Sequence, residues 1–287
     1  MLLLIICILL YRRYRNPSVP DNINLYNAIS DATNNFSDRN IIGRGNASTV
    51  YRGFFENSDK AFKSFNNVIS FQHEKHIFTV IGPHDTIINL ISYENEHLIL
   101  IIEYMIGGNL YNYIHMNLPI DRIEITKRLQ ISLDISNGIK HMHDNEILHK
   151  DINASNVLLN DERTSAKICD FELSRPIDHP DNQGFPRGHI GYFERDDYNY
   201  YTTTQDIYRL GVIFIELITN THANRHDPIR RELPNYVLNN GNIQQGWPED
   251  FLSIAESCCT NIIVNRPTAN YLTQAIQNII ADMNQNA

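Results

Sequence analysis

The chain has 287 residues, of which 42% are hydrophobic and 20% are charged. This composition is that of an ordinary globular protein and excludes a disordered or fibrous chain, while the length suits two lobes packed together. The formal net charge of -9 argues against a nucleic acid partner, because phosphate backbones attract basic surfaces.

The N-terminus carries an apolar segment, residues 1–11, in which Leu2 to Leu10 is uninterrupted and a basic cluster follows directly. The run is about half of the roughly 20 apolar residues that a spanning helix needs, so it predicts a partial, transmembrane-like segment before a juxtamembrane segment at 12–35. The basic cluster would lie on the cytoplasmic side, which favours membrane association through residues 1–15. The alternative is a start-codon artefact or a loose hydrophobic tail on a cytoplasmic protein. The four cysteines lack metal-ligand and disulfide spacing, which fits a reducing compartment.

The first third of the chain reads as strands with two helices. The spacing of apolar residues predicts a short helix first, then a hairpin, a longer helix and a second hairpin. In chain order these elements are expected at Leu25–Thr33, at Thr49–Phe55 with Lys60–Phe65, at Ser70–Ile81, and at Ile87–Tyr93 with His97–Tyr104. The domain core of this part is therefore a sheet with one helix, preceded by the short one.

Helical periodicity dominates after Asn109. Two segments between the predicted helices, Ile147–Asn160 and Ala166–Asp196, are irregular and rich in His, Asp, Asn and Gly. Chemistry is often carried on such loops. The long helices are expected at Ile123–Asp144, Gln205–Thr219, Glu249–Cys259 and Thr268–Met283.

A glycine-rich loop opens the predicted sheet. Gly43 and Gly45 are the first two glycines of a G-x-G-x-x-G pattern, and Ser48 stands in place of the third. Missing side chains let backbone N–H groups approach phosphates. In a dinucleotide-binding fold the loop would lead into a helix, whereas here it leads into a strand at Val50. Taken alone, the loop is equally consistent with a plain hairpin turn.

Two charged residues strengthen the phosphate-binding interpretation. Lys63 follows Ala61 at the spacing of the V-A-I-K lysine motif, on the next predicted strand. Glu74 lies on the following helix, where it would pair with that lysine and orient it on the α- and β-phosphates.

The strongest motif is His149-Lys150-Asp151 with Asn156, followed by Asp170-Phe171. The order and spacing match H-R-D-x-x-x-x-N and D-F-G. In that interpretation Asp151 accepts the proton of a substrate hydroxyl, while Asn156 and Asp170 hold the metal ions that bridge the phosphates.

With these motifs the chain resembles protein kinases, and among them the wall-associated type of plant receptor-like kinases. The motif Glu103-Tyr104-Met105 resembles the hinge that meets adenine, with Ile102 as gatekeeper. The resemblance implies ATP with Mg²⁺, or Mn²⁺ as an alternative, and catalytic roles for Asp151, Lys63, Glu74 and Asn156. The implied ATP-binding residues are Ile42, Gly43, Gly45, Val50, Ala61, Lys63, Glu103 and Met105, and the implied metal ligands are Asn156 and Asp170.

The expected fold class is therefore α+β, with a small β-rich lobe that carries one regulatory helix and a larger, mainly helical lobe. The expected kinase domain spans 36–285, divided into an N-lobe at 36–102, a hinge at 103–108 and a C-lobe at 109–285. The resemblance also implies a place at the plasma membrane with the kinase domain on its cytoplasmic side.

Several positions depart from the family pattern. Lys150 replaces an arginine and loses the planar fork that grips an activation-loop phosphate. Asn153 replaces a supporting lysine, and Glu172 replaces the glycine of D-F-G, where a side chain should restrict the backbone. His189 replaces a threonine of the substrate site, and Asp196 stands as a shortened carboxylate partner for Arg266.

Two functions follow from these residues. The first is a serine/threonine kinase of receptor-like kinase signalling, which transfers the γ-phosphate of ATP to protein hydroxyls. The second is a pseudokinase scaffold that binds an active receptor-like kinase and biases its state. A nucleotide-binding dehydrogenase is excluded, because the strand after the glycines and the later Asp motifs have no place in it.

Overall fold

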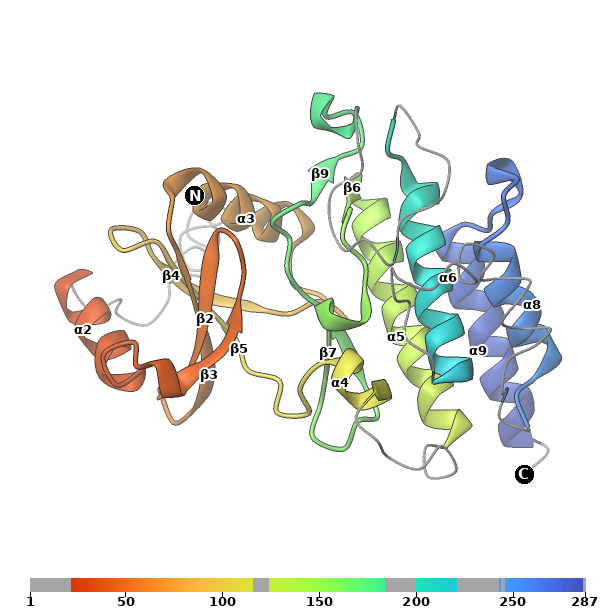
Figure 1. Cartoon of the computed structure of the whole chain (residues 1–287), viewed down its shortest axis with the longest axis horizontal. Coiled ribbons are helices and arrows are strands. Elements are labelled where there is room, and N and C mark those ends of the chain that lie inside the picture. Colours follow the sequence, from red (N-terminus) through yellow and green to blue (C-terminus); the bar gives the residue numbers. More distant parts are fainter. Residues whose placement is uncertain are drawn as a thin grey trace, which may run out of the picture. The chain divides into compact units, whose positions relative to one another are not determined.

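The computed structural model describes residues 22–115, 124–183, 192, 200–220, 243 and 246–285 (Figure 1). The apolar N-terminal segment, His189 and Asp196 lie outside these residues. Within the described part, no helix combines the length and the hydropathy needed to cross a bilayer. The described part of the chain divides into two compact units, one formed by residues 22–71 and 90–104, the other by residues 72–89 and the described residues from 105 onward.

The first unit is built on an antiparallel five-stranded sheet with the order β1-β2-β3-β5-β4. Both predicted hairpins are present, and the predicted short helix packs beside the sheet. The strands are β1 (Ile41–Arg44), β2 (Ser48–Phe55), β3 (Ser58–Phe65), β4 (Leu90–Glu94) and β5 (Ile99–Glu103), and the helix is α2 (Asn22–Ala32).

Alternation along the strands gives the sheet two different faces. On one face the paired residues Phe62 of β3 and Ile101 of β5 form a buried cluster with Leu25 and Ile29 of α2. The residues next to them in sequence therefore point to the opposite face. That second face carries Lys63, which pairs with Leu100.

Close contact between α2 and β2 depends on a glycine, which gives a stability prediction. A Cβ at Gly53 would lie 2.6 Å from the carbonyl oxygen of Ala32 and 2.9 Å from the ring of Phe62. We expect Gly53→Ala to lower the free energy of unfolding by about 1–3 kcal/mol, because the helix must move off the sheet. Chemical denaturation would measure the loss. The control is Gly43→Ala, whose Cβ would meet only Val50 at 3.8 Å; an equal loss in both variants would contradict this account.

The second unit is mainly helical. In Figure 1 its long helices α5, α6, α8 and α9 lie side by side, with α5 packed against α6 and α9. Helix α3 (Val68–Ile81) begins in the first unit and continues into this one. The other helices are α4 (Leu110–His115), α5 (Ile125–Asp144), α6 (Thr203–Thr219), α8 (Glu249–Cys258) and α9 (Ala269–Gln285).

The segments expected to be irregular contain short strands and turns that periodicity did not indicate. Two- and three-residue strands are too short to show an alternating pattern. They are β6 (Ile147–Leu148), β7 (Val157–Leu159), β8 (Ala166–Ile168) and β9 (Arg175–Pro176), with 3₁₀ turns η3 (Ala154–Asn156), η4 (Pro180–Asn182) and η7 (Ile263–Asn265), while η1 (Asp38–Asn40) precedes the sheet. The expected α+β fold class, with a β-rich unit and a helical unit, is confirmed.

Candidate active site

Three of the residues expected to bind ATP lie in one line across the sheet of the first unit. Gly43 of β1 is opposite Val50 of β2, and Val50 is opposite Lys63 of β3. Residues directly opposite one another in antiparallel strands present their side chains to the same face. Ala61, two residues before Lys63, shares that face by alternation and is opposite Ile102 of β5. The register therefore gathers a glycine, small apolar side chains and one cation on one face.

The glycine-rich loop leaves room above this face. A Cβ at Gly43 would meet only the side chain of Val50, and a Cβ at Gly45 would meet Ser48 at 3.6 Å. Neither glycine has a positive φ, so neither is required by its backbone conformation. The amide of Gly45 donates to the carbonyl of Ser48 at 2.8 Å, which closes the turn. The space above the glycines is what close approach of a phosphate would need.

Lys63 and Glu74 are both buried, Lys63 on β3 of the first unit and Glu74 on α3 in the second. Ionised side chains are rarely buried without compensation, so each of the two charges requires a partner. Their pairing with each other remains a prediction, as does the role of Ile42, which is half-exposed on β1.

The predicted hinge follows β5. Glu103 is the last residue of that strand and pairs with Lys60 of β3, and at Met105 the chain returns to the second unit. Gly107 then lies so close to residues 159 and 160 that a Cβ would lie 2.0 Å from the carbonyl oxygen of Asn160. The glycine therefore lets the predicted hinge pass directly against the end of β7.

The predicted catalytic loop brings Asp151 and Asn156 into direct contact. The side-chain amide of Asn156 donates to Asp151 Oδ2 at 3.1 Å and to the Asp151 carbonyl at 2.9 Å. The other carboxylate oxygen, Oδ1, accepts from Arg209 Nη1 of α6 at 3.3 Å. The Asp151 side chain is still 19% exposed. A carboxylate oxygen has more than one lone pair, so this fixed group retains the capacity to accept a proton.

The β7–β8 hairpin places Asp170 beside this loop. Val157 pairs with Ile168, so the residues just before β7 and just after β8 are neighbours. The amide of Cys169 donates to the carbonyl of Asn156 at 2.9 Å. Asp170 itself has a φ of 68°, a left-handed conformation that is uncommon outside glycine and is often found at functional sites. The structure thus brings two of the predicted oxygen ligands to one end of one hairpin.

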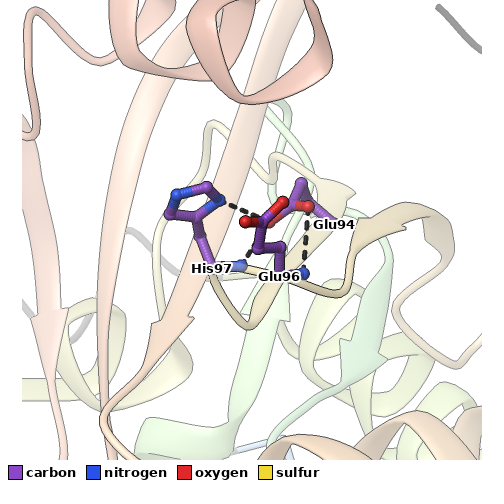
Figure 2. Close-up of side chains that lie close together, drawn as sticks. All are labelled: Glu94, Glu96 and His97. Atoms are coloured by element: carbon purple, nitrogen blue, oxygen red, sulfur yellow. Dashed lines mark hydrogen bonds and ion pairs between the residues drawn. The ribbon is translucent and has the colours of Figure 1, made fainter. Parts of the chain in front are cut away.

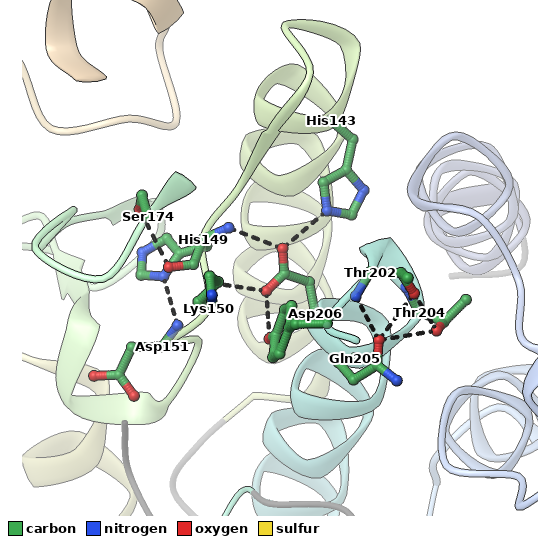
Figure 3. A network of polar contacts seen from close by, with 10 residues as sticks. His143, His149, Lys150, Asp151, Ser174, Thr202, Thr204, Gln205 and Asp206 are labelled. Carbon is green, nitrogen blue, oxygen red and sulfur yellow. Dashed lines mark hydrogen bonds and ion pairs between the residues drawn. The ribbon is translucent and has the colours of Figure 1, made fainter. Parts of the chain in front are cut away.

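A buried carboxylate on α6 supports the predicted catalytic loop (Figure 3). Asp206 accepts from the backbone amides of His149 at 2.9 Å and Lys150 at 3.0 Å, and from the hydroxyl of Tyr201 at 2.8 Å. Burial alone would raise its pKa, but the hydrogen bond from His143 and the other donors hold the pKa of Asp206 at about 2. The loop that carries Asp151 is therefore anchored by a permanent buried charge.

Arg209 was not among the site residues predicted from the sequence. Its side chain is only 2% exposed, and it places a guanidinium next to the carboxylate of Asp151. The signal was an arginine inside the otherwise apolar run of α6, because a buried charge is normally paired.

The departures at Asn153 and Glu172 have structural consequences. Asn153 faces inward, donating to the carbonyl of Asp151 at 2.9 Å and accepting from the amide of Ser155 at 2.9 Å, so it shapes the loop and supplies no cation. Glu172 has no positive φ. In this conformation the backbone of Glu172 therefore lies outside the left-handed region that favours glycine. The expected restriction of backbone rotation at this position stays a prediction.

A second cluster of ligand-type residues lies in the turn between β4 and β5 (Figure 2). Glu94, Glu96 and His97 each offer one atom within 4.8 Å of the others. However, Glu94 already accepts from the amides of Glu96 and His97 and from the ring of His97 at 3.1 Å. These bonds explain the cluster as a turn closed by a buried carboxylate.

The link between α3 and the segment after Asp170 gives a pH prediction. Arg175 Nη1 lies 2.7 Å from His73 Nε2, and burial together with this cation lowers the pKa of His73 to about 4. Between pH 4 and 6.5, His73 is protonated in the unfolded chain but neutral in the folded chain. The free energy of unfolding should therefore fall as the pH drops through this window. Chemical denaturation at pH 7 and at pH 5 would measure this fall. From pH 7 to pH 5, the free energy of unfolding should fall less for His73→Gln than for the unmodified chain. An equal loss would exclude His73 as a contributor.

The residues present fit a nucleotide with a divalent cation. In the second unit, Asn156 and Asp170 carry side-chain oxygens of the kind that Mg²⁺ and Mn²⁺ accept as ligands. In the first unit, the buried Lys63 lies on the same face of the sheet as Val50 and Gly43.

Comparison with known proteins places these features in a family. The sequence model described as "Protein tyrosine and serine/threonine kinase" matches residues 37–276. The chain is 29% identical over 278 residues to the calcium/calmodulin-regulated receptor-like kinase 2 of Arabidopsis thaliana, covering 88% of this chain and 63% of that one. It is 32% identical to the putative wall-associated receptor kinase-like 13 and 34% identical to the wall-associated receptor kinase-like 17 of the same plant, each over 67% of this chain. The match covers 27% and 26% of those two proteins. The chain thus spans less than two thirds of these relatives.

Proposed function

Because this chain belongs to the protein tyrosine and serine/threonine kinase family, with a kinase domain of the plant receptor-like type, we propose that it transfers the γ-phosphate of ATP to serine and threonine hydroxyls of proteins. The observation that carries the proposal is the catalytic loop. Asp151 is held at both carboxylate oxygens, is still partly exposed, and lies on the same loop as Asn156.

In the proposed reaction, Mg²⁺ bound to ATP would neutralise the charge that develops on the transferred phosphate. Asn156 and Asp170 would hold the metal through their side-chain oxygens. Asp151 would orient the acceptor hydroxyl and accept its proton, while Lys63, oriented by Glu74, would hold the α- and β-phosphates. Adenine would lie against the face formed by Val50, Ala61 and the segment from Glu103 to Met105.

The activity can be tested with acceptor peptide libraries that differ only in their single hydroxyl residue, which is Ser, Thr or Tyr. We expect ATP- and Mg²⁺-dependent phosphorylation of the Ser and Thr libraries, with Mn²⁺ as the alternative metal. Phosphorylation of the Tyr library alone would overturn the assigned specificity, and no transfer to any library would overturn the kinase activity.

A second candidate function, a pseudokinase scaffold, is favoured by Asn153. This neutral side chain is committed to the loop and supplies no cation beside the transferred phosphate, where charge stabilisation matters most. A scaffold would bind ATP and a partner receptor-like kinase without turnover. A thermal-shift titration separates the cases, since a ligand that binds the folded state raises the melting temperature. A shift with ATP but no phosphotransfer would favour the scaffold.

The cellular setting is proposed from the relatives. The relatives are receptor-like kinases. By analogy, the kinase domain, residues 36–285, would lie on the cytoplasmic face of the plasma membrane. Residues 1–15 would contribute to membrane association. A cytoplasmic protein is the alternative. Fusing residues 1–35 to a fluorescent protein would distinguish them, since a diffuse cytoplasmic signal would contradict membrane association.

A further inference from the structure

The segment after Asp170 is held by cations that find their partners within the chain. Lys150 is buried, and its ammonium donates to the carbonyl of Asp181 at 2.8 Å and to Asn182 Oδ1 at 3.0 Å. It also lies 5.5 Å from the ring centre of Tyr201. The cation that stands in the phosphate-gripping position of the motif is therefore engaged by two residues of η4.

Asn182 is the centre of this arrangement. It is 1% exposed, and its side-chain amide donates to the carbonyls of Pro176 at 2.8 Å and Ile177 at 2.7 Å. Its own carbonyl accepts from the amide of Tyr201 at 2.7 Å. Through its side chain and its backbone carbonyl, this one buried residue of η4 thus contacts both the end of β9 and the residues that precede α6.

Arg175 is a second cation that makes contacts within this segment. Arg175 donates through Nε to Asp181 Oδ2 at 3.3 Å and through Nη1 to the carbonyls of Glu172 at 3.1 Å and Ser174 at 2.8 Å. The same Nη1 reaches the ring of His73 on α3. The carboxylate of Asp181 therefore supplies a negative charge to Arg175, while Lys150 is bound by the backbone carbonyl of the same residue.

The sequence of the segment offers almost nothing for a kinase to modify. From Phe171 to Asp196 the only serine or threonine is Ser174. It is 0% exposed, and its hydroxyl donates to the carbonyl of His149 at 3.2 Å. Phosphorylating it would require this part of the fold to open.

Lys150 also has a φ of 69°, which is costly for a residue with a Cβ. Such a conformation persists only where the surrounding contacts determine it. Here those contacts come from Asp206 on the backbone side and from Asp181 and Asn182 on the side-chain side.

We propose that Asp181 and Asn182 act as a built-in substitute for an activating phosphate, so that residues 171–183 keep their ordered conformation without phosphorylation. This clamp, formed by Lys150, Arg175, Asp181 and Asn182, bears on the regulation of the proposed kinase site. Its test measures order in the chain, not phosphotransfer, so failure of the clamp and failure of the proposed function are distinguishable.

The experiment is hydrogen–deuterium exchange with mass spectrometry on the full chain, treated with phosphatase and shown by intact mass to be unphosphorylated. The amides of Ile177, His179 and Asn182 donate hydrogen bonds within the fold, so peptides from 171–183 should exchange at least about 10-fold more slowly than an unstructured peptide of the same sequence. Exchange at the unstructured rate in this sample, with slowing only after phosphorylation, would overturn the proposal by itself.

Variants assign the effect to the clamp. Lys150→Met and Asn182→Ala should raise exchange in 171–183 by about 10-fold or more, while peptides of α9 remain protected. Asp178→Asn is the matched control, because Asp178 is an exposed carboxylate of the same segment, and it should leave exchange unchanged. Unchanged exchange in both clamp variants would contradict the proposal. A variant that also loses protection in α9 has unfolded and does not report on the clamp. In that case the exchange of 171–183 in the phosphatase-treated unmodified chain tests the proposal.

Discussion

Replacing Asp151 with asparagine is expected to lower the rate of phosphotransfer by about 10³-fold, within the range that a positioned general base contributes. The asparagine amide retains the shape of the carboxylate and an oxygen that can accept from Asn156 or Arg209. It cannot take the proton of the acceptor hydroxyl. The proton-accepting step is therefore removed while the loop keeps its support from Asp206.

This loss should appear in the turnover rate, since Asp151 has no assigned part in holding ATP. Steady-state kinetics and an ATP thermal-shift titration on the same preparations would separate turnover from binding. Asp161→Asn, an exposed carboxylate in the turn between β7 and β8, should behave like the unmodified chain. If Asp151→Asn transferred phosphate at more than about a tenth of the original rate, Asp151 would not be the base.

The largest expected effect on stability comes from Asp206→Ala, which we expect to lower the free energy of unfolding by about 3–5 kcal/mol, as for the loss of one partner from a buried charged network. The substitution leaves the amides of His149 and Lys150 and the hydroxyl of Tyr201 without their acceptor. Each buried donor left unsatisfied costs about 1–3 kcal/mol. Such a loss is a large part of the stability of a typical domain.

Chemical denaturation of Asp206→Ala and of Asp206→Asn would measure the loss in the free energy of unfolding. Asp206→Asn should lose less than Asp206→Ala, because the amide oxygen can still accept one of these bonds. The control is Asp144→Ala on α5, whose ion pair with Lys140 is 58% exposed on the carboxylate side and should be worth less than about 1 kcal/mol. Similar losses at Asp144 and Asp206 would mean that the network under the catalytic loop does not support the fold.

Local patterns and motif spacing were sufficient to predict much of the fold and of the candidate site. The predicted hairpins put Val50 and Lys63 on adjacent strands, and the register of β2 and β3 pairs them directly. Likewise, the five-residue spacing from Asp151 to Asn156 matches a loop in which the two side chains touch. In both cases the residues are close in sequence or joined by one turn, so local rules apply.

The contacts that sequence did not predict join residues far apart in the chain. Arg209 meets Asp151 across 58 residues, and Arg175 meets His73 across 102 residues. No periodicity connects such positions, because their proximity depends on how the helices and the short strands pack. The backbone angle of Glu172 is likewise determined by the fold and could not be predicted from the local sequence.

The most direct test of the central claim, that this fold is an active kinase, is to compare incorporation of label from ATP labelled at the γ-phosphate with ATP labelled at the α-phosphate. The purified chain would be incubated with Mg²⁺ and a protein acceptor, and Asp151→Asn would serve as the reference for background. We expect label in the acceptor from γ-labelled ATP alone, at a level well above that obtained with Asp151→Asn. Equal incorporation by the unmodified chain and by Asp151→Asn would contradict it.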